Sequence, residues 1–291
     1  MWNTAPTSLA IVIVVGLLGL KVVWPQESAP PRIDEEIAKQ EKIFQRRGAD
    51  VPRGYITNRG LSGYAELLPS AFCDALGRLG SSDRWLDIGA GAGQAILDYH
   101  AVERDASSDQ QCVRPGPKAR AVAISIENRE TDKWRERAAR LGHDRIRYLS
   151  GKRLRQYSPS ELGNFQIITD VFGGFTYTDD LSGFVERVLR LLEVGGGFYT
   201  LLPGVHLEGG DKLGTWYLTE LENAAGRPEK VCSWLKKISC VQVICESKSD
   251  WKRPTELISV RKVCSETAVP RMKLVEFAAG YPPDRRFQLE P

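Results

Sequence analysis

Apolar and polar residues follow two patterns along the chain from about residue 51 onward. Short, nearly continuous apolar runs indicate buried strands, and segments with apolar residues three and four apart indicate amphipathic helices. The predicted strands are residues 84–88, 119–126, 145–149, 165–171, 198–202, 240–245 and 256–263. The predicted helices are residues 67–79, 93–100, 131–141 and 181–192. Strands that alternate with helices are typical of a parallel sheet covered by helices on both faces, and the last two strands can form an antiparallel pair.

The first 25 residues are far more apolar than the rest of the chain. Residues 9–20 form a continuous apolar run, and residues 22–24 extend it past Lys21. A helix over residues 9–24 would be about 24 Å long, somewhat short of a hydrocarbon core of about 30 Å. Basic residues follow the run and do not precede it, so the positive-inside rule predicts that the bulk of the chain is cytoplasmic. We therefore expect residues 1–25 to be a membrane anchor. The alternatives are a signal peptide, which would export the protein, and a buried or partner-binding apolar segment.

Residues 26–50 are predicted to be a linker and a spacer helix. The linker contains several prolines, and a helix over residues 33–47 begins with three acidic residues and ends with Arg46, Arg47 and Gly48. This order complements the helix dipole and supplies a C-terminal cap. A narrow apolar face could lie on a membrane or dock on the main domain. The remaining residues, 51–291, are predicted to form that main domain.

Composition excludes several classes of protein. A hydrophobic content of 42%, a charged content of 26% and a net charge of +3 are ordinary for a globular domain and give no strong signal for nucleic-acid binding. The basic residues between positions 129 and 155 are interpreted as a solvated helix face. The six cysteines include no Cys-x-x-Cys pair and the three histidines are scattered, so no metal is expected. Cys240 and Cys245 are predicted to be small buried apolar residues; the even number permits disulfides, but a domain of this size does not need them.

Candidate chemistry is concentrated in residues 85–96, whose sequence is Trp-Leu-Asp-Ile-Gly-Ala-Gly-Ala-Gly-Gln-Ala-Ile. A buried strand, a glycine-rich turn and the start of a helix form a seat for a nucleotide-like cofactor in α/β folds. Asp87 stands at the end of the strand, facing the crevice. The glycines at 89, 91 and 93 let the backbone turn tightly and let a ligand approach. The dinucleotide fingerprint needs a small third residue at position 94, where this chain has Gln94, so a nicotinamide-dependent oxidoreductase is disfavoured.

The pattern Asp-x-Gly-x-Gly-x-Gly, with its strand and helix, resembles the first motif of the class I S-adenosylmethionine-dependent methyltransferases. The resemblance covers roughly residues 55–265. It implies an α/β fold with a doubly wound, mostly parallel seven-stranded sheet, helices on both faces and the last strand antiparallel, here preceded by an N-terminal apolar helix. It also implies S-adenosyl-L-methionine as the cofactor and methyl transfer as the activity, so that residues 51–291 would be a methyltransferase-like domain.

The same resemblance implies a set of cofactor-binding residues: Asp87, Gly89, Ala90, Gly91, Gly93, Glu127, Gly151 and Asp170. Glu127 ends the second strand, where the family binds the ribose hydroxyls, and a carboxylate can accept two such hydrogen bonds. Gly151 follows the third strand, but Lys152 replaces the acid that the family commonly has near the adenine. Asp170 ends the fourth strand at the mouth of the site. The turn at residues 191–196 looks like the family's Leu-x-Pro-Gly-Gly turn, with Val194 in place of proline.

The acceptor is less well defined. Phe172, Phe175 and Tyr177 are candidates for the wall of an acceptor pocket or for core aromatics, and His206 is a weak candidate for a general base. Residues 170–175 lack both the Asp/Asn-Pro-Pro-Tyr/Phe sequence of amino-methylating nucleic-acid enzymes and the Pro-Cys of enzymes that attack pyrimidine carbon. We expect an acceptor that is a small molecule or lipid-like. The alternatives are a protein or RNA methyltransferase and a non-catalytic cofactor-fold module that recruits partners.

Overall fold

The computed structural model describes residues 32–44, 56–101, 112, 118–207, 214–217, 219–248 and 255–291, with only the backbone at 204–207 and 214–217. The chain divides into two compact units, Met1–Pro31 and Arg32–Pro291. All described residues belong to the second unit. The predicted anchor at residues 1–25, including the apolar run at 9–24, lies outside them. Within the described part of the chain, no helix is both long and apolar enough to cross a bilayer.

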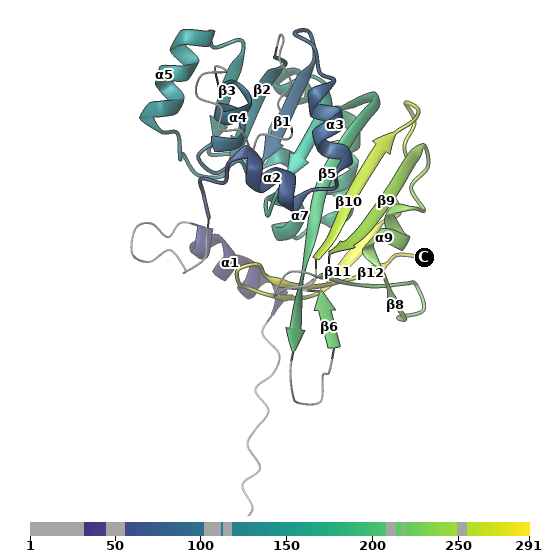
Figure 1. Cartoon of the computed structure of the whole chain (residues 1–291). Helices are drawn as coiled ribbons and strands as arrows, with labels where there is room; N and C mark the ends of the chain where they lie inside the picture. Colours follow the sequence, from purple (N-terminus) through teal and green to yellow (C-terminus); the bar gives the residue numbers. More distant parts are fainter. Residues whose placement is uncertain are drawn as a thin grey trace, which may run out of the picture. The chain divides into compact units, whose positions relative to one another are not determined.

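The main sheet has eight strands, seven of which lie in the order β3-β2-β1-β4-β5-β10-β9 (Figure 1). Their bounds are β1 Arg84–Ile88, β2 Arg120–Ser125, β3 Ile146–Ser150, β4 Phe165–Asp170, β5 Leu192–Leu207, β9 Val241–Lys248 and β10 Thr255–Lys262. Strands β1 to β5 are parallel, and β10 is antiparallel to both β5 and β9. The seven-stranded, mostly parallel sheet is therefore confirmed. The eighth strand, β6 Gly214–Tyr217, was not predicted and pairs with the far end of β5.

Helices cover both faces of this sheet. Their bounds are α2 Leu61–Leu67, α3 Ala71–Gly77, α4 Gln94–Tyr99, α5 Asp132–Leu141, η3 Leu154–Gln156, α6 Pro159–Leu162, α7 Gly174–Tyr177, α8 Leu181–Leu191 and α9 Val231–Leu235. Side chains alternate across β1, so that Trp85 packs in the core under α2–α5 and Leu86 in the core under α8. The single helix predicted over residues 67–79 is wrong: Pro69 separates α2 from α3, because proline breaks a helix interior.

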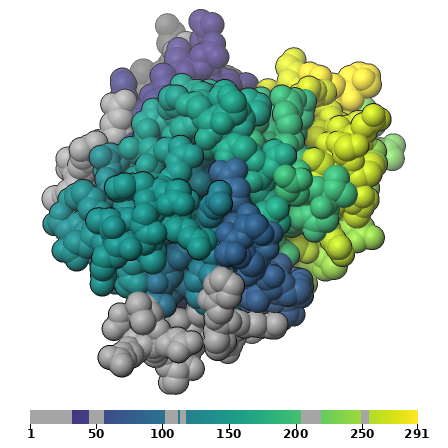
Figure 2. Space-filling view, turned by 90° about the horizontal axis from the view of Figure 1, so that it is seen from above, coloured from purple at the N-terminus to yellow at the C-terminus, as the bar shows by residue number. Residues whose placement is uncertain are grey.

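A second sheet was not predicted at all. Its order is β11-β12-β7-β8, with bounds β11 Met272–Ala278, β12 Asp284–Leu289, β7 Thr219–Glu222 and β8 Pro228–Glu229. Helix α1, Ile33–Phe44, packs on β11, and the side chains of Glu36 and Gln40 accept the backbone N–H groups of Ala279 and Gly280 at 2.8 Å. The predicted spacer helix thus docks on the main unit. In Figure 2 the teal segments around β2, β3 and α5 lie on the opposite side from the yellow C-terminal strands.

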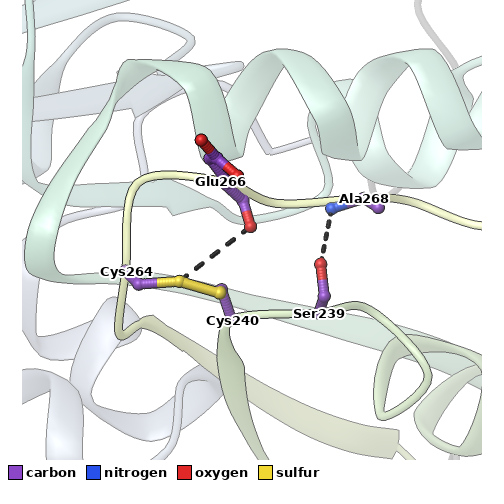
Figure 3. Close-up of a disulfide and its surroundings, with 5 residues drawn as sticks. All are labelled: Ser239, Cys240, Cys264, Glu266 and Ala268. Atoms are coloured by element: carbon purple, nitrogen blue, oxygen red, sulfur yellow. Dashed lines mark hydrogen bonds between the residues drawn. A yellow bond between two sulfur atoms is a disulfide. The ribbon is translucent and has the colours of Figure 1, made fainter.

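All six cysteines form disulfides: Cys73–Cys112, Cys232–Cys245 and Cys240–Cys264. The prediction that Cys240 and Cys245 are simple buried apolar residues is therefore wrong. Figure 3 shows the pair that joins the residue before β9 to the chain after β10; beside it, the Ser239 hydroxyl accepts the Ala268 N–H at 2.8 Å.

Candidate functional site

A cavity of about 540 Å³ opens at the carboxyl ends of the central strands. Its walls include residues 89–91 after β1, residues 124–127 at the end of β2, and residues 171–174 after β4. The strand order reverses between β1 and β4, and doubly wound sheets bind ligands at such a reversal. The volume lies in the range of about 300 to 1,000 Å³ that is usual for small-molecule sites.

The glycine turn after β1 is tightly enclosed by the protein's own chain. Gly89, Gly91 and Gly93 have φ values of +73°, +55° and +73°, in the left-handed region that favours glycine. A Cβ at Gly89 would lie 2.5 Å from the Cα of Gly173, and one at Gly91 would overlap the Thr57 carbonyl. Gly89, Ala90 and Gly91 line the cavity. Gly93 does not line it, because the Trp134 indole covers it.

The two predicted acids at strand ends, Asp87 and Asp170, are 0% exposed and do not line the cavity. Asp87 accepts hydrogen bonds from the Tyr64 hydroxyl at 2.9 Å and the Thr169 hydroxyl at 2.8 Å. Asp170 accepts the backbone N–H groups of Gly173 and Phe175, both at 2.9 Å. Burial raises the pKa of each carboxyl to about 7. These acids therefore position the turns around the cavity, whereas the sequence predicted direct contacts to a ligand.

Glu127 follows β2 and lines the cavity. Its Oε2 atom accepts a hydrogen bond from Arg129 Nη2 at 2.5 Å, whereas its Oε1 atom is buried and has no hydrogen-bond partner within the described structure. An unsatisfied buried acceptor costs free energy, and a ligand that donates a hydroxyl hydrogen removes that cost. Gly151 lines a smaller cavity that adjoins Glu127. These two predicted residues therefore lie close together.

Tyr148 connects the glycine turn to the Glu127 loop, and sequence reasoning missed it. Its hydroxyl donates to the Gly91 carbonyl and accepts the Arg129 N–H at 3.1 Å. The Trp134 ring packs edge-on against it, with the centroids 5.4 Å apart. In the sequence, a single aromatic residue on a strand predicts a core position. No local signal therefore identifies Tyr148 as the link between the glycine turn and the Glu127 loop.

Known proteins provide a limited comparison. No family model matches the chain, and no curated protein matches it. Among solved structures, the N-terminal domain of EvdMO1 with SAH bound is 12% identical, with a TM-score of 0.43, over 81% of this chain and 98% of that one. An rRNA methylase from Streptococcus thermophilus is 13% identical, with a TM-score of 0.41, over 67% and 96%. The phosphoethanolamine N-methyltransferase 2 of Haemonchus contortus, in complex with S-adenosyl-L-methionine, is 13% identical, with a TM-score of 0.41, over 79% and 57%.

Likeness at this level identifies neither a family nor an acceptor. The strand order, the antiparallel strand β10 between β5 and β9, and the cavity at the reversal of strand order are features of a doubly wound α/β sheet. The chain has a doubly wound α/β fold with a mostly parallel sheet. The glycine turn follows the first strand and Glu127 follows the second, and both line the cavity.

One side of the cavity is aromatic. Phe172 and Tyr177 line it, but Phe175 does not. Phe175 is 0% exposed and packs against Phe184 and Phe198 with centroids 6.1 Å away, so it is the core aromatic that the sequence offered as the alternative to a place in the wall. The side chain of His206, the candidate base, lies outside the described residues.

Phe172 is held in an unusual conformation at the edge of this cavity. It has a φ of +56°, which is rare for a bulky residue and typical of strained functional sites. The guanidinium of Arg59 stacks 5.0 Å from its ring centroid. Arg59 also lines the cavity, so it brings positive charge to the wall beside Phe172.

The basic residues between positions 129 and 155 are largely engaged by internal partners. Arg153 and Arg155 both pair with Asp179, and Lys152 pairs with Glu161 at 2.8 Å. Other members of the group also have local partners: Arg129 pairs with Glu127, Arg135 with Asp132, and the buried Arg137 donates to the His100 carbonyl. This arrangement does not favour an extended phosphate-binding track, which needs cations free to contact a backbone.

Proposed function

We propose that this protein binds S-adenosyl-L-methionine in the cavity and transfers the methyl group to a small or lipid-like acceptor. The observation that carries the proposal is the buried, unpaired Oε1 atom of Glu127 in the wall of a cavity of about 540 Å³. A ribose offers two adjacent hydroxyl donors, which suit this carboxylate. The glycine turn offers a close backbone approach for the amino-acid end of the same molecule.

Several residues would divide the work of holding this cofactor. Glu127 would accept from the ribose, and the backbone at residues 89–91 would lie against the amino-acid end. Arg59 is half-buried, and none of the ion pairs among the described residues includes it. Its guanidinium would attract the carboxylate at the amino-acid end of the cofactor. Tyr148 acts through Gly91 and the loop of Glu127 as a positioning residue.

When bound, the cofactor supplies a methyl group activated by a positive sulfur. The chain must then exclude water and orient the acceptor, and Phe44, Phe172 and Tyr177 provide apolar surface in the cavity wall for both tasks. The edge-on contact of Phe44 with Tyr177, 5.5 Å between centroids, brings helix α1 into this wall. A general base is needed only for an acceptor that is not already ionised, so no base is assigned.

The aromatic wall supports a small or lipid-like acceptor, and the engaged basic residues give no support to RNA. Membrane attachment through residues 9–24 is proposed from the sequence alone. Carbonate washing of membrane fractions tests that part: a tethered protein stays with the membranes.

The decisive experiment has two stages. Calorimetry on the purified full-length chain is expected to show saturable S-adenosyl-L-methionine binding, and its absence would refute the proposal. Transfer of tritiated methyl groups into fractionated lysate is then expected to label the small-molecule or lipid fraction. Label in the RNA or protein fraction would correct the acceptor class. Cofactor binding with no label in any fraction would favour the non-catalytic module.

A further inference from the structure

We propose that the Arg32–Pro291 unit folds and works in an oxidising compartment outside the cytoplasm. The observation is that the whole cysteine complement of the chain is paired: six cysteines form three disulfides and none is free. Disulfides persist in secreted, lumenal and periplasmic proteins and are rare where glutathione keeps thiols reduced. Cytoplasmic thiols are under no selection to lie in pairs, so complete pairing is evidence about the compartment.

The geometry of the pairs supports bonding across separate segments. The Cα atoms of Cys232 and Cys245 are 6.3 Å apart, and those of Cys240 and Cys264 are 5.2 Å apart. Both distances lie in the usual range of about 4.4 to 6.8 Å for disulfides. The Cα atoms of the third pair, Cys73 and Cys112, are 4.3 Å apart, just below this range, and the pair links positions 39 residues apart in sequence. No pair is formed by neighbouring residues.

Two of the three disulfides secure the same structural weak point. Strand β9 lies at the edge of the path of seven strands and has β10 as its neighbour, so it is held by hydrogen bonds from one side. Cys245 fixes the middle of β9 to helix α9, and Cys240 fixes its start to the chain beyond β10 (Figure 3). An edge strand is prone to fraying and to pairing with other chains, and covalent ties oppose both.

A metal site is the competing explanation for one of these pairs. Ligand atoms of Cys232, Cys245 and Glu256 lie within 4.8 Å of one another. Two sulfurs bonded to each other are not thiolates and cannot serve as metal ligands. A cytoplasmic form of the protein would have these thiols reduced and available to zinc, so metal content separates the two explanations.

The chemistry requires an oxidant. Each bond forms by two successive thiol–disulfide exchanges, in which two cysteine thiols lose two protons and two electrons and the disulfide of an oxidising protein is released as a dithiol. Such donors act in the compartments named above. The placement reverses the cytoplasmic one expected from the charges after residues 9–24, and it holds for an exported chain and for a membrane-tethered one. It is independent of the proposed function, because an inactive module would carry the same bonds.

The first test counts thiols. The full-length protein is trapped in cells with acid and N-ethylmaleimide and then weighed by mass spectrometry. We expect no labelled cysteine before reduction and six after it. Cys240→Ser is expected to expose one reactive thiol, whereas the paired control Cys240→Ser with Cys264→Ser exposes none. Six free thiols in the trapped wild type, or zinc retained with Cys232 and Cys245 free, would overturn the proposal.

The second test reports the compartment directly. Gly80→Asn completes an Asn-Ser-Ser glycosylation sequence with the exposed Ser81 and Ser82, at a position where the backbone leaves room for a side chain. Gly80→Gln is the matched control without an acceptor. In cells that glycosylate asparagine, the first variant is expected to gain a glycan that an endoglycosidase removes, and the control none. A first variant without the glycan would contradict the placement.

Discussion

Replacing Glu127 by glutamine tests the central contact of the proposed cofactor site. The substitution keeps the size of the side chain and one oxygen acceptor, but it removes the charge from the buried Oε1 atom. A hydrogen bond to a charged group contributes about 1.5 to 3 kcal/mol, compared with about 1 kcal/mol for a neutral one. The difference of about 0.5 to 2 kcal/mol would weaken S-adenosyl-L-methionine binding by roughly 2- to 30-fold, since 1.4 kcal/mol corresponds to a factor of ten.

Isothermal calorimetry measures the effect, and Glu130→Gln is the control. Glu130 lies three residues further on, pairs with Arg135 at 3.8 Å, and does not line the cavity. We expect the control to bind the cofactor as the wild type does. A correctly folded Glu127→Gln protein whose Kd stays within about twofold of wild type would refute the assignment of Glu127 to the ribose. If transfer is observed, its KM for the cofactor should rise more than kcat falls.

Three further predictions concern the turn, the buried acids and the disulfides. Gly91→Ala should lower both the free energy of unfolding and the cofactor affinity, each by more than about 1 kcal/mol. Gly195→Ala, also at positive φ but with open space around it, should lower the free energy of unfolding by less. Equal losses in urea unfolding would contradict the steric account. The pKa of Asp87 is raised from 3.8 to about 7 in the folded state, so the folded state binds more protons than the unfolded chain between about pH 4 and 7, and the free energy of unfolding falls as the pH rises through that window. Asp87→Asn should make this decline shallower. An unchanged slope of unfolding free energy against pH would disprove the shift. Replacing Cys73 and Cys112 together by serine removes a cross-link between positions 39 residues apart and should lower the free energy of unfolding by about 4 kcal/mol. The contribution of this bond to the effect of reductant on Tm should also be lost. A variant as stable as the oxidised wild type would exclude that bond.

Much of the fold was predictable because its signals are local. Strands β1 to β4 and β10 are short apolar runs bounded by polar turns, and α5 and α8 carry apolar residues at helical spacing. Strand β5, Leu192–Leu207, is longer than the predicted strand 198–202 and includes most of the predicted turn at residues 191–196. These patterns depend on the periods of 2 and 3.6 residues and need no knowledge of distant segments. Pro69 is also a local signal for a helix break, but the apolar pattern on both sides of this proline predicted one continuous helix. The glycine turn follows a strand predicted in the same way, and the role of Glu127 at the end of the next strand was implied by the resemblance to the class I methyltransferases.

The second sheet and the disulfides depend on contacts between distant segments. Strand β12 pairs with β7 in parallel although more than sixty residues separate them, and Arg285 of β12 is fully buried while it donates to the carbonyls of Phe175 and Thr178. A periodic pattern carries no information about which segment is the partner. For the same reason the six cysteines could be counted but not paired.

The amino-acid sequence by itself determined the parallel sheet, the glycine turn and the position of Glu127, because each follows from residues close together in the chain. Tertiary structure alone decided which of the predicted site residues face the cavity. Asp87, Asp170 and Phe175 do not line the cavity. Packing turns Asp87 toward Tyr64 and Thr169 and buries Asp170 and Phe175. Tyr148 was brought in, because only the pairing of β2 with β3 sets its hydroxyl beside the Gly91 carbonyl. Burial and orientation are properties of the assembled sheet, so no stretch of sequence encodes them alone.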